Sequence, residues 1–158
     1  MSLEPLDTAA GSDYPACRQL SVFVENRLGQ LLRLTRLFEG TDVHILAVAV
    51  AGATDCAIVR MIVNDPDTAH EMLCEANFAV SENEVLVVEL PPGKRGIRRM
   101  CEALIAGEVN MNYIYPLFPL DDYAACVALQ VDNLALGAAV LRGREFTLLD
   151  QSDLERNH

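Results

Sequence analysis

An internal duplication is the feature of this chain that most constrains its fold. The stretch from Leu20 to Ser81 has a weaker echo from Val85 to Leu149, with the same kinds of residue in the same order. In each copy an apolar run meets a turn, and a helical pattern follows. A repeat of roughly 65 residues is too long for a solenoid unit and suits a small domain. The sequence therefore predicts two small domains of one fold.

Hydrophobic periodicity predicts the elements of the first copy. A helix is expected over residues 29–39, where apolar side chains recur on one face. Strands over 43–50 and 56–63 are joined by a short glycine-containing link, which favours an antiparallel hairpin. A second helix starts at Pro66 with Asp65 as N-cap, and a last strand follows. The order is β-α-β-β-α-β.

The second copy repeats this order, which is the ferredoxin-like α+β plan with both helices on one face of an antiparallel sheet. Its elements are expected as a strand from Val85, a helix through Ile97–Ile105, strands near 109–117 and 124–131, a helix over 133–142 capped by Asp132 or Asn133, and a strand over 146–149. The predicted organisation is a flexible tail over 1–17, a first module over 18–82, a second module over 83–150 and a C-terminal tail over 151–158.

The hairpin strands of the first copy are apolar on both faces. His44 and Arg60 are the main exceptions over 43–50 and 56–63. A sheet with one wet face would alternate apolar and polar residues, so both faces should be covered. The helix-free face is therefore expected to pack against the other module or a second chain. The modules are expected to join side by side into one eight-stranded sheet, and a homodimer would hide further apolar surface.

Composition and charge exclude several classes of binding partner. A net charge of -11 argues against nucleic acid or an anionic membrane as a partner. No apolar stretch reaches about 18 residues, so no membrane span is expected. No secretory signal is recognised at the N-terminus. Five cysteines without a CxxC pair or a zinc-ligand spacing indicate reduced thiols in a cytoplasmic protein, and no metal or cofactor is expected.

The first copy also resembles a known family. The run Val22–Leu31, with Asn26 and Gly29 in its turn, is similar to the opening of an ACT domain, the βαββαβ module that binds amino acids and regulates metabolic enzymes. The resemblance covers nearly all of Gln19 to Leu149 as tandem copies and is weaker in the second. With no catalytic domain attached, the chain looks like a free-standing tandem ACT protein, similar to those labelled acetolactate synthase small-subunit-like.

The resemblance implies a ligand site at the first strand-to-helix turn. Free N–H groups at a helix N-terminus attract a carboxylate, and Gly29 would let a ligand approach the backbone closely. The family's site also implies residues from the facing module's second strand, or His44 from the first copy itself. The candidate ligand-binding residues are Asn26, Leu28, Gly29, Gln30, Leu31, His44, Asn112 and Tyr113.

The corresponding turn of the second copy departs from this pattern. Arg95 stands where the first copy has its glycine, and Pro91 and Pro92 remove two backbone donors, so one ligand site per chain is expected. The cations Lys94, Arg95, Arg98 and Arg99 could hold a phosphate at the helix N-terminus. A solvated basic face that touches an acidic partner surface is the favoured interpretation of these four residues.

The leading hypothesis is an amino-acid-binding regulatory protein whose ligand lies between ACT modules and controls their association or a partner enzyme. One alternative is the regulatory small subunit of acetolactate (acetohydroxyacid) synthase. Another is a small phosphate-ester or acyl-phosphate hydrolase of ferredoxin-like fold, with Arg27 and Asn26 in its turn. Because no Ser-His-Asp spacing, HExxH, P-loop or GxGxxG occurs, no catalytic residue and no enzyme activity are expected.

Overall fold

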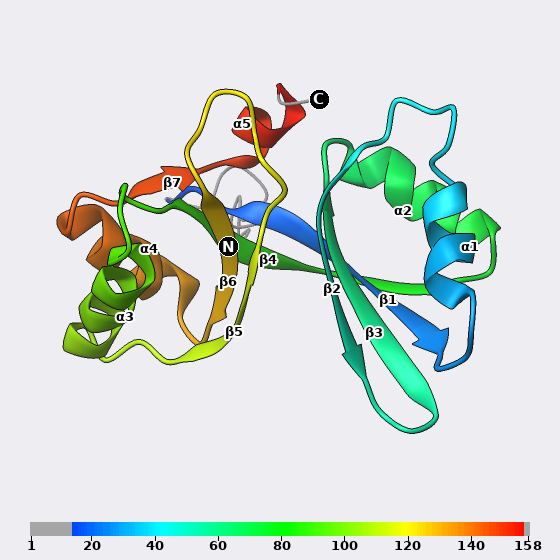
Figure 1. The fold of residues 1–158 in the computed structure, drawn as a ribbon, viewed down its shortest axis with the longest axis horizontal. Coiled ribbons are helices and arrows are strands. Elements are labelled where there is room, and N and C mark those ends of the chain that lie inside the picture. The colour runs from blue at the N-terminus through cyan, green and yellow to red at the C-terminus, as the bar shows by residue number, and fades with distance from the viewer. Residues whose placement is uncertain (1–13, 157–158) are drawn as a thin grey trace, which may run out of the picture.

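Residues 14–156 are described by the computed structural model as two βαββαβ modules (Figure 1). The first comprises β1 (Cys17–Glu25), α1 (Gln30–Arg36), β2 (Ile45–Gly52), β3 (Cys56–Val63), α2 (Pro66–Glu75) and the first part of β4 (Ala79–Glu89). The second comprises the rest of β4, α3 (Gly96–Ala106), β5 (Met111–Pro116), β6 (Cys126–Val131), α4 (Leu134–Gly143) and β7 (Thr147–Leu149). The short helix α5 (Gln151–Glu155) follows. The α+β class and the tandem ferredoxin-like plan are confirmed.

One strand, β4, belongs to both modules. Its first part pairs antiparallel with β1, from Ala79 opposite Phe23 to Val85 opposite Cys17. Its last part pairs with β6 on one edge, and with β7 on the edge that β1 occupies further along. A single sheet therefore runs through the molecule in the order β2-β3-β1-β4-β6-β5, with β7 in line with β1.

Two expectations differ from this arrangement. The sheet has seven strands instead of eight, because the strands expected on either side of residues 82 and 83 are one. No Gly or Pro interrupts Ala79–Glu89, so nothing there ends the strand. The C-terminal tail expected from residue 151 instead begins with α5, since Asp150 and Asp153 form a capping box and Leu154 is fully buried. Of the N-terminal tail expected over 1–17, residues 1–13 lie outside the described residues.

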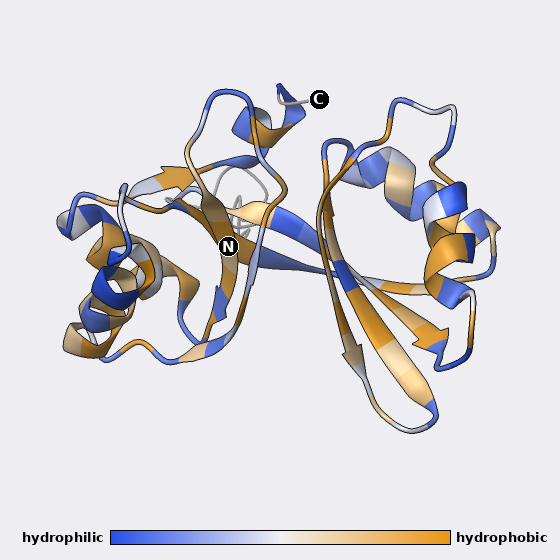
Figure 2. Ribbon diagram, viewed as in Figure 1, coloured by the Kyte–Doolittle hydropathy of each residue, from blue (hydrophilic) through white to orange (hydrophobic). Residues whose placement is uncertain are grey.

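The helices cover the outer faces and the helix-free faces look toward each other (Figure 1). Between them lies a core that neither module could form alone. It joins Leu46, Ala47 and Ile62 of the first module to Tyr115, Leu117 and Ala128 of the second. The predicted packing of the helix-free face against the other module is thus present within the chain. Figure 2 shows β3 apolar along most of its length, as that double coverage requires.

Each helical layer has its own core. Leu34, Leu73 and Met61 are fully buried in the first module, and Met100, Leu129 and Leu141 in the second. The predicted caps are present: Asp65 accepts a hydrogen bond from the N–H of Thr68 at 3.2 Å, and Asn133 accepts one from Leu136 at 3.1 Å. No helix among the described residues is long and apolar enough to cross a membrane.

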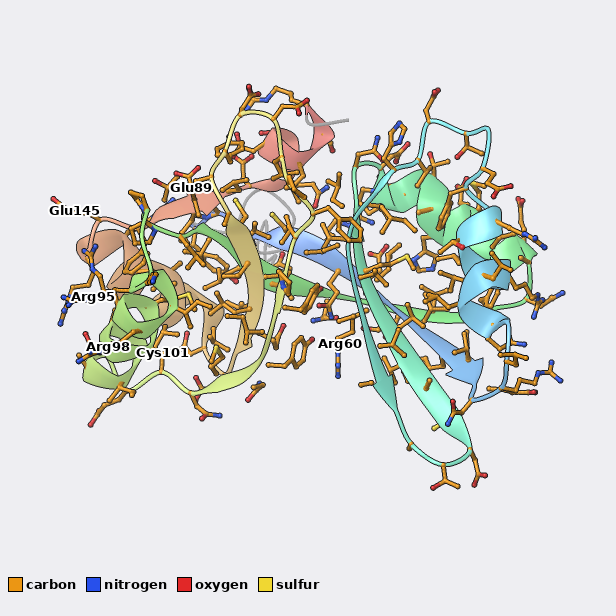
Figure 3. The ribbon with its side chains drawn as sticks, in the orientation of Figure 1. Arg60, Glu89, Arg95, Arg98, Cys101 and Glu145 are labelled. Carbon is orange, nitrogen blue, oxygen red and sulfur yellow. The ribbon has the colours of Figure 1, made fainter. Side chains whose placement is uncertain are left out.

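A polar cluster lies between the modules, and we call it the intermodule polar cluster. Its centre is Gln19, whose side chain is fully buried. Gln19 Nε2 donates to Tyr113 Oη at 2.8 Å and to Asn83 Oδ1 at 3.1 Å, and Tyr115 Oη donates to Gln19 Oε1 at 2.5 Å. The guanidinium of Arg60 lies 4.0 Å from the centre of the Tyr113 ring. Figure 3 shows Arg60 projecting from the first module toward the second.

Buried thiols and hydroxyls here stay protonated at neutral pH. Burial raises the pKa of Tyr115 and of Cys17 far above their usual values, and it raises the pKa of Cys126 to about 11. Cys17 Sγ instead donates to the carbonyl of Leu149 at 3.4 Å, which joins the start of β1 to the end of β7. The five cysteines are all free thiols.

Candidate ligand-binding site

The turn between β1 and α1 presents backbone N–H groups to solvent. Gly29 has φ +86°, in the left-handed region, and a Cβ built there would meet nothing within 4 Å. No side chain caps the seven-residue helix that follows. Among the hydrogen bonds of residues 14–156, none uses the N–H of Leu28, Gly29, Leu31 or Leu32. The first intrahelical bond runs from Arg33 N to Gly29 O at 3.0 Å.

Those donors border an open hollow of about 550 Å³, which we call the turn groove. Its floor is the helix side of the sheet, where Val24, Ala57 and Val59 are buried. Large apolar side chains around its rim are unusually exposed: Leu28 fully, Leu31 to 42%, Leu32 to 52% and Val50 to 53%. The groove thus combines free donors with apolar walls, the usual make-up of a small-molecule site.

Five of the residues selected from sequence lie together at this groove: Asn26, Leu28, Gly29, Gln30 and Leu31. Two of them are already engaged. Asn26 Nδ2 donates to the carbonyl of Ala53 at 2.7 Å and so fastens the β2–β3 turn, while the N–H of Gln30 bonds to the carbonyl of Arg27 at 3.5 Å. No local sequence signal indicated Val50, Ala57 and Val59, because they reach the groove from the distant hairpin.

The other three selected residues lie elsewhere. β1 and β2 both run antiparallel to β3 and therefore point the same way, so His44, just before β2, is about one strand length, ~25 Å, from Gly29. His44 lines a separate notch of about 210 Å³ with Phe118 and Asp121. Asn112 is exposed on β5, and Tyr113 is engaged in the intermodule polar cluster. Because the modules meet through their helix-free faces, β5 does not reach the turn groove.

The corresponding turn of the second module has a different character. Gly93 takes the left-handed conformation with φ +99°, and Arg95 is the N-cap residue of α3. A Cβ on Gly96 would approach the carbonyl oxygen of Pro91 to 3.1 Å. The residues that line a hollow of about 400 Å³ here include Lys94, Arg95 and Arg99. Within residues 14–156, no group of three His, Cys, Asp or Glu side chains could hold a metal ion.

The fold defines the class of tandem βαββαβ modules. The sequence model of the ACT domain pair matches residues 16–156, and the chain belongs to that family. The resemblance seen in the sequence is therefore confirmed. None of the curated proteins matches the chain.

Solved structures show the same architecture. The protein BT0572 from Bacteroides thetaiotaomicron is 30% identical, with a TM-score of 0.82 over 92% of this chain and 99% of that one. The regulatory subunit of aspartate kinase from Thermus thermophilus is 12% identical, with a TM-score of 0.57 over 84% and 93% of the two chains. The corresponding Thermus flavus subunit is 9% identical, with a TM-score of 0.52 over 83% and 93%. The two Thermus subunits share the fold with this chain.

Proposed function

We propose that this chain is a regulatory protein that binds an amino acid in the turn groove. The observation that carries the proposal is the meeting of unpaired N–H groups with apolar walls around Gly29. The N–H groups of Leu28 and Gly29 would receive the ligand's carboxylate, while Asn26 keeps its side-chain oxygen for the ammonium group. The apolar walls favour an aliphatic side chain on the ligand.

The exposed side of the groove indicates how binding would be linked to association. Val50 lies on β2, which is an edge strand of the sheet and carries no charged residue. An uncharged edge strand beside exposed Leu28, Leu31 and Leu32 suits pairing with a second copy of the chain. In a homodimer built this way the groove would be closed by the partner, so the ligand would lie between ACT modules of two chains.

Linkage then provides the regulation. A ligand that binds only the assembled form stabilises it by RT ln(1 + [L]/Kd), about 2.7 kcal/mol at a hundredfold excess over Kd. The same linkage could act on a biosynthetic enzyme that binds one of the two states. A regulatory small subunit of acetolactate synthase is one form of this proposal. Purification from the native source tests it, because that form requires a stoichiometric catalytic subunit.

The turn residues bear on the hydrolase alternative. A hydrolase would need Arg27 and Asn26 free to hold a phosphate, yet Arg27 pairs with Glu25 at 3.1 Å and the Asn26 amide nitrogen holds the hairpin. No observation therefore favours the hydrolase.

A cytoplasmic location fits five unbonded thiols, which an oxidising compartment would tend to join.

A thermal-shift screen over the twenty amino acids tests the function. We expect one small group, chosen by side chain, to raise the melting temperature at millimolar concentration. Gly29→Asp should abolish the shift, since its carboxylate would repel the ligand's. Gly93→Asp is the matched control, because both glycines have φ between +86° and +99° and open space where a side chain would begin. The proposal fails if no amino acid stabilises the chain or if both variants respond like the wild type.

A further inference from the structure

Half of the positive charge of this acidic chain is gathered on the helical layer of the second module. Six of its 12 lysine and arginine residues lie there, against a net charge of -11 for the whole chain. They are Lys94, Arg95, Arg98, Arg99, Arg142 and Arg144. Figure 3 shows Arg95 and Arg98 at the outer side of this module, far from the intermodule polar cluster.

These cations are largely unpaired. Within residues 14–156, Arg98 is the one member of the six with an ion pair, to Glu102 at 2.8 Å. Of the six lysine and arginine residues elsewhere, Arg18, Arg27 and Arg156 pair with a carboxylate, and Arg33 and Arg60 lie over aromatic rings. In a chain with 23 acidic residues, the gathering of five cations without an ion pair on one helical layer is a local concentration of positive charge.

Three of the cations, Lys94, Arg95 and Arg99, line a concave surface, which we call the cationic groove. It is the hollow of about 400 Å³ lined by Pro91, Pro92, Gly93, Lys94, Arg95, Gly96 and Arg99, and no carboxylate is among these residues. Arg99 also lines an adjoining hollow of about 240 Å³, which contains Arg144 together with Glu89 and Glu145. Glu89 is partly engaged, because its Oε2 accepts the N–H of Ala124 at 3.0 Å.

The backbone beneath the groove is tightly held. Two consecutive prolines restrict the start of the turn, and Gly96 packs so closely that a Cβ would come within 3.2 Å of Leu90. Cations in this first turn also oppose the dipole of α3, which has no acidic residue there to compensate. The chain therefore keeps positive charge, at a cost in helix stability, around a preformed hollow.

We propose that the cationic groove binds a small, multiply charged anion of the phosphate class. Lys94, Arg95 and Arg99 would supply its countercharges, with arginine offering paired N–H donors that match phosphate oxygens. A small anion fits better than a nucleic acid or an anionic membrane, since the large negative charge elsewhere on the chain repels both. The second module would then bind a different class of ligand from the first.

Calorimetric titration of the full chain with pyrophosphate, at constant ionic strength set with chloride, tests this site. We expect saturable binding, and Arg99→Gln should weaken it about tenfold, as loss of a charged hydrogen bond does. Arg36→Gln, an exposed arginine on α1, is the matched control and should leave Kd unchanged. Inorganic phosphate and citrate show whether phosphate geometry or charge alone is recognised.

The position of the pyrophosphate site can be tested first in the wild-type chain. In the wild-type chain, pyrophosphate should shift the backbone amide resonances of Gly93, Gly96 and Ile97 and leave those of Leu28 and Gly29 in place. Gly93→Asp should abolish pyrophosphate binding while amino-acid binding persists, and Gly29→Asp should do the reverse, so either proposal can fail alone. The inference is overturned if pyrophosphate gives no more heat than chloride, if Arg99→Gln binds as the wild type does, or if polyglutamate binds where pyrophosphate does not.

Discussion

Gln19 is the polar residue on which the joint between the modules most depends. Its amide is fully buried, and its Nε2 and Oε1 contact Asn83, Tyr113 and Tyr115. A buried amide is stable only while such partners remain, because an unsatisfied group retains its full desolvation cost. The intermodule polar cluster thus fixes which side chains of the two helix-free faces stand opposite each other.

Replacing Gln19 by leucine should lower the free energy of unfolding by about 2–4 kcal/mol, since two tyrosine hydroxyls and Asn83 each lose a partner. Urea denaturation followed by circular dichroism measures the change. Asn112→Ala is the control, because Asn112 is exposed and its side-chain oxygen accepts a hydrogen bond from the exposed Asn110. A Gln19→Leu loss as small as that of the control would contradict a stabilising role for the cluster.

At the scale of elements, the two edges of the sheet differ. β2 has the sequence ILAVAVAG, with its second half exposed and no charge to discourage pairing. Natural edge strands commonly carry a lysine or a proline for that purpose. β5, at the opposite edge, contains Pro116 and the exposed polar Asn112. The contrast favours β2 as the edge that would meet the second chain in the proposed dimer.

Val50→Lys should therefore convert a dimer to a monomer, because it places a charge beside the strand pairing proposed for β2. Light scattering at micromolar concentration gives the oligomeric state. Asn112→Lys places the same charge on the opposite edge and should leave the dimer intact. Equal dissociation of both variants, or a monomeric wild type at high micromolar concentration, would contradict pairing through β2.

For the whole molecule, the decisive feature is the core shared by the helix-free faces. Leu46 and Ala47 of one module and Tyr115 and Leu117 of the other are buried in it, and Leu154 of α5 closes it. Modules of this size bury too little surface to be comfortably stable alone. Since their cores are joined through this one and through β4, neither module can open without exposing the other.

Unfolding is therefore expected to be a single two-state transition. Tyrosine fluorescence, to which Tyr113 and Tyr115 between the modules contribute with Tyr14 and Tyr123, and far-ultraviolet circular dichroism, which reports on the helices, should give coincident urea curves. Separate midpoints for the two signals would show that the modules unfold independently.

Local patterns accounted for much of this fold from sequence. The limits of β3 and the capping of α2 by Asp65 were predicted as found, because both depend on neighbouring residues alone. α1 was expected to reach residue 39, but it ends at Arg36 and the chain continues in turns. β4 was missed as one strand because its polar stretch, Ser81–Glu84, looks like a link between modules.

The candidate site was less accessible from sequence. Asn26 to Leu31 are consecutive, so their grouping needed no tertiary information. His44, Asn112 and Tyr113 were added because the family resemblance implied them, and within the chain they lie away from the turn groove. Arg99 and Arg144 line one hollow because α3 packs against α4. No local sequence pattern indicates that two distant residues come together in this way.

The shared strand also determines which face of the sheet each module turns toward the other. Along β4, Val80, Leu86 and Val88 face the helical layers, while Val85 and Val87 face the core between the modules. Side chains alternate with a period of two, so a single inserted residue in the polar middle would exchange the two faces of everything beyond it. The spacing between the duplicated halves is therefore constrained: an insertion or deletion of an odd number of residues in the link would turn one module's core-facing side chains outward.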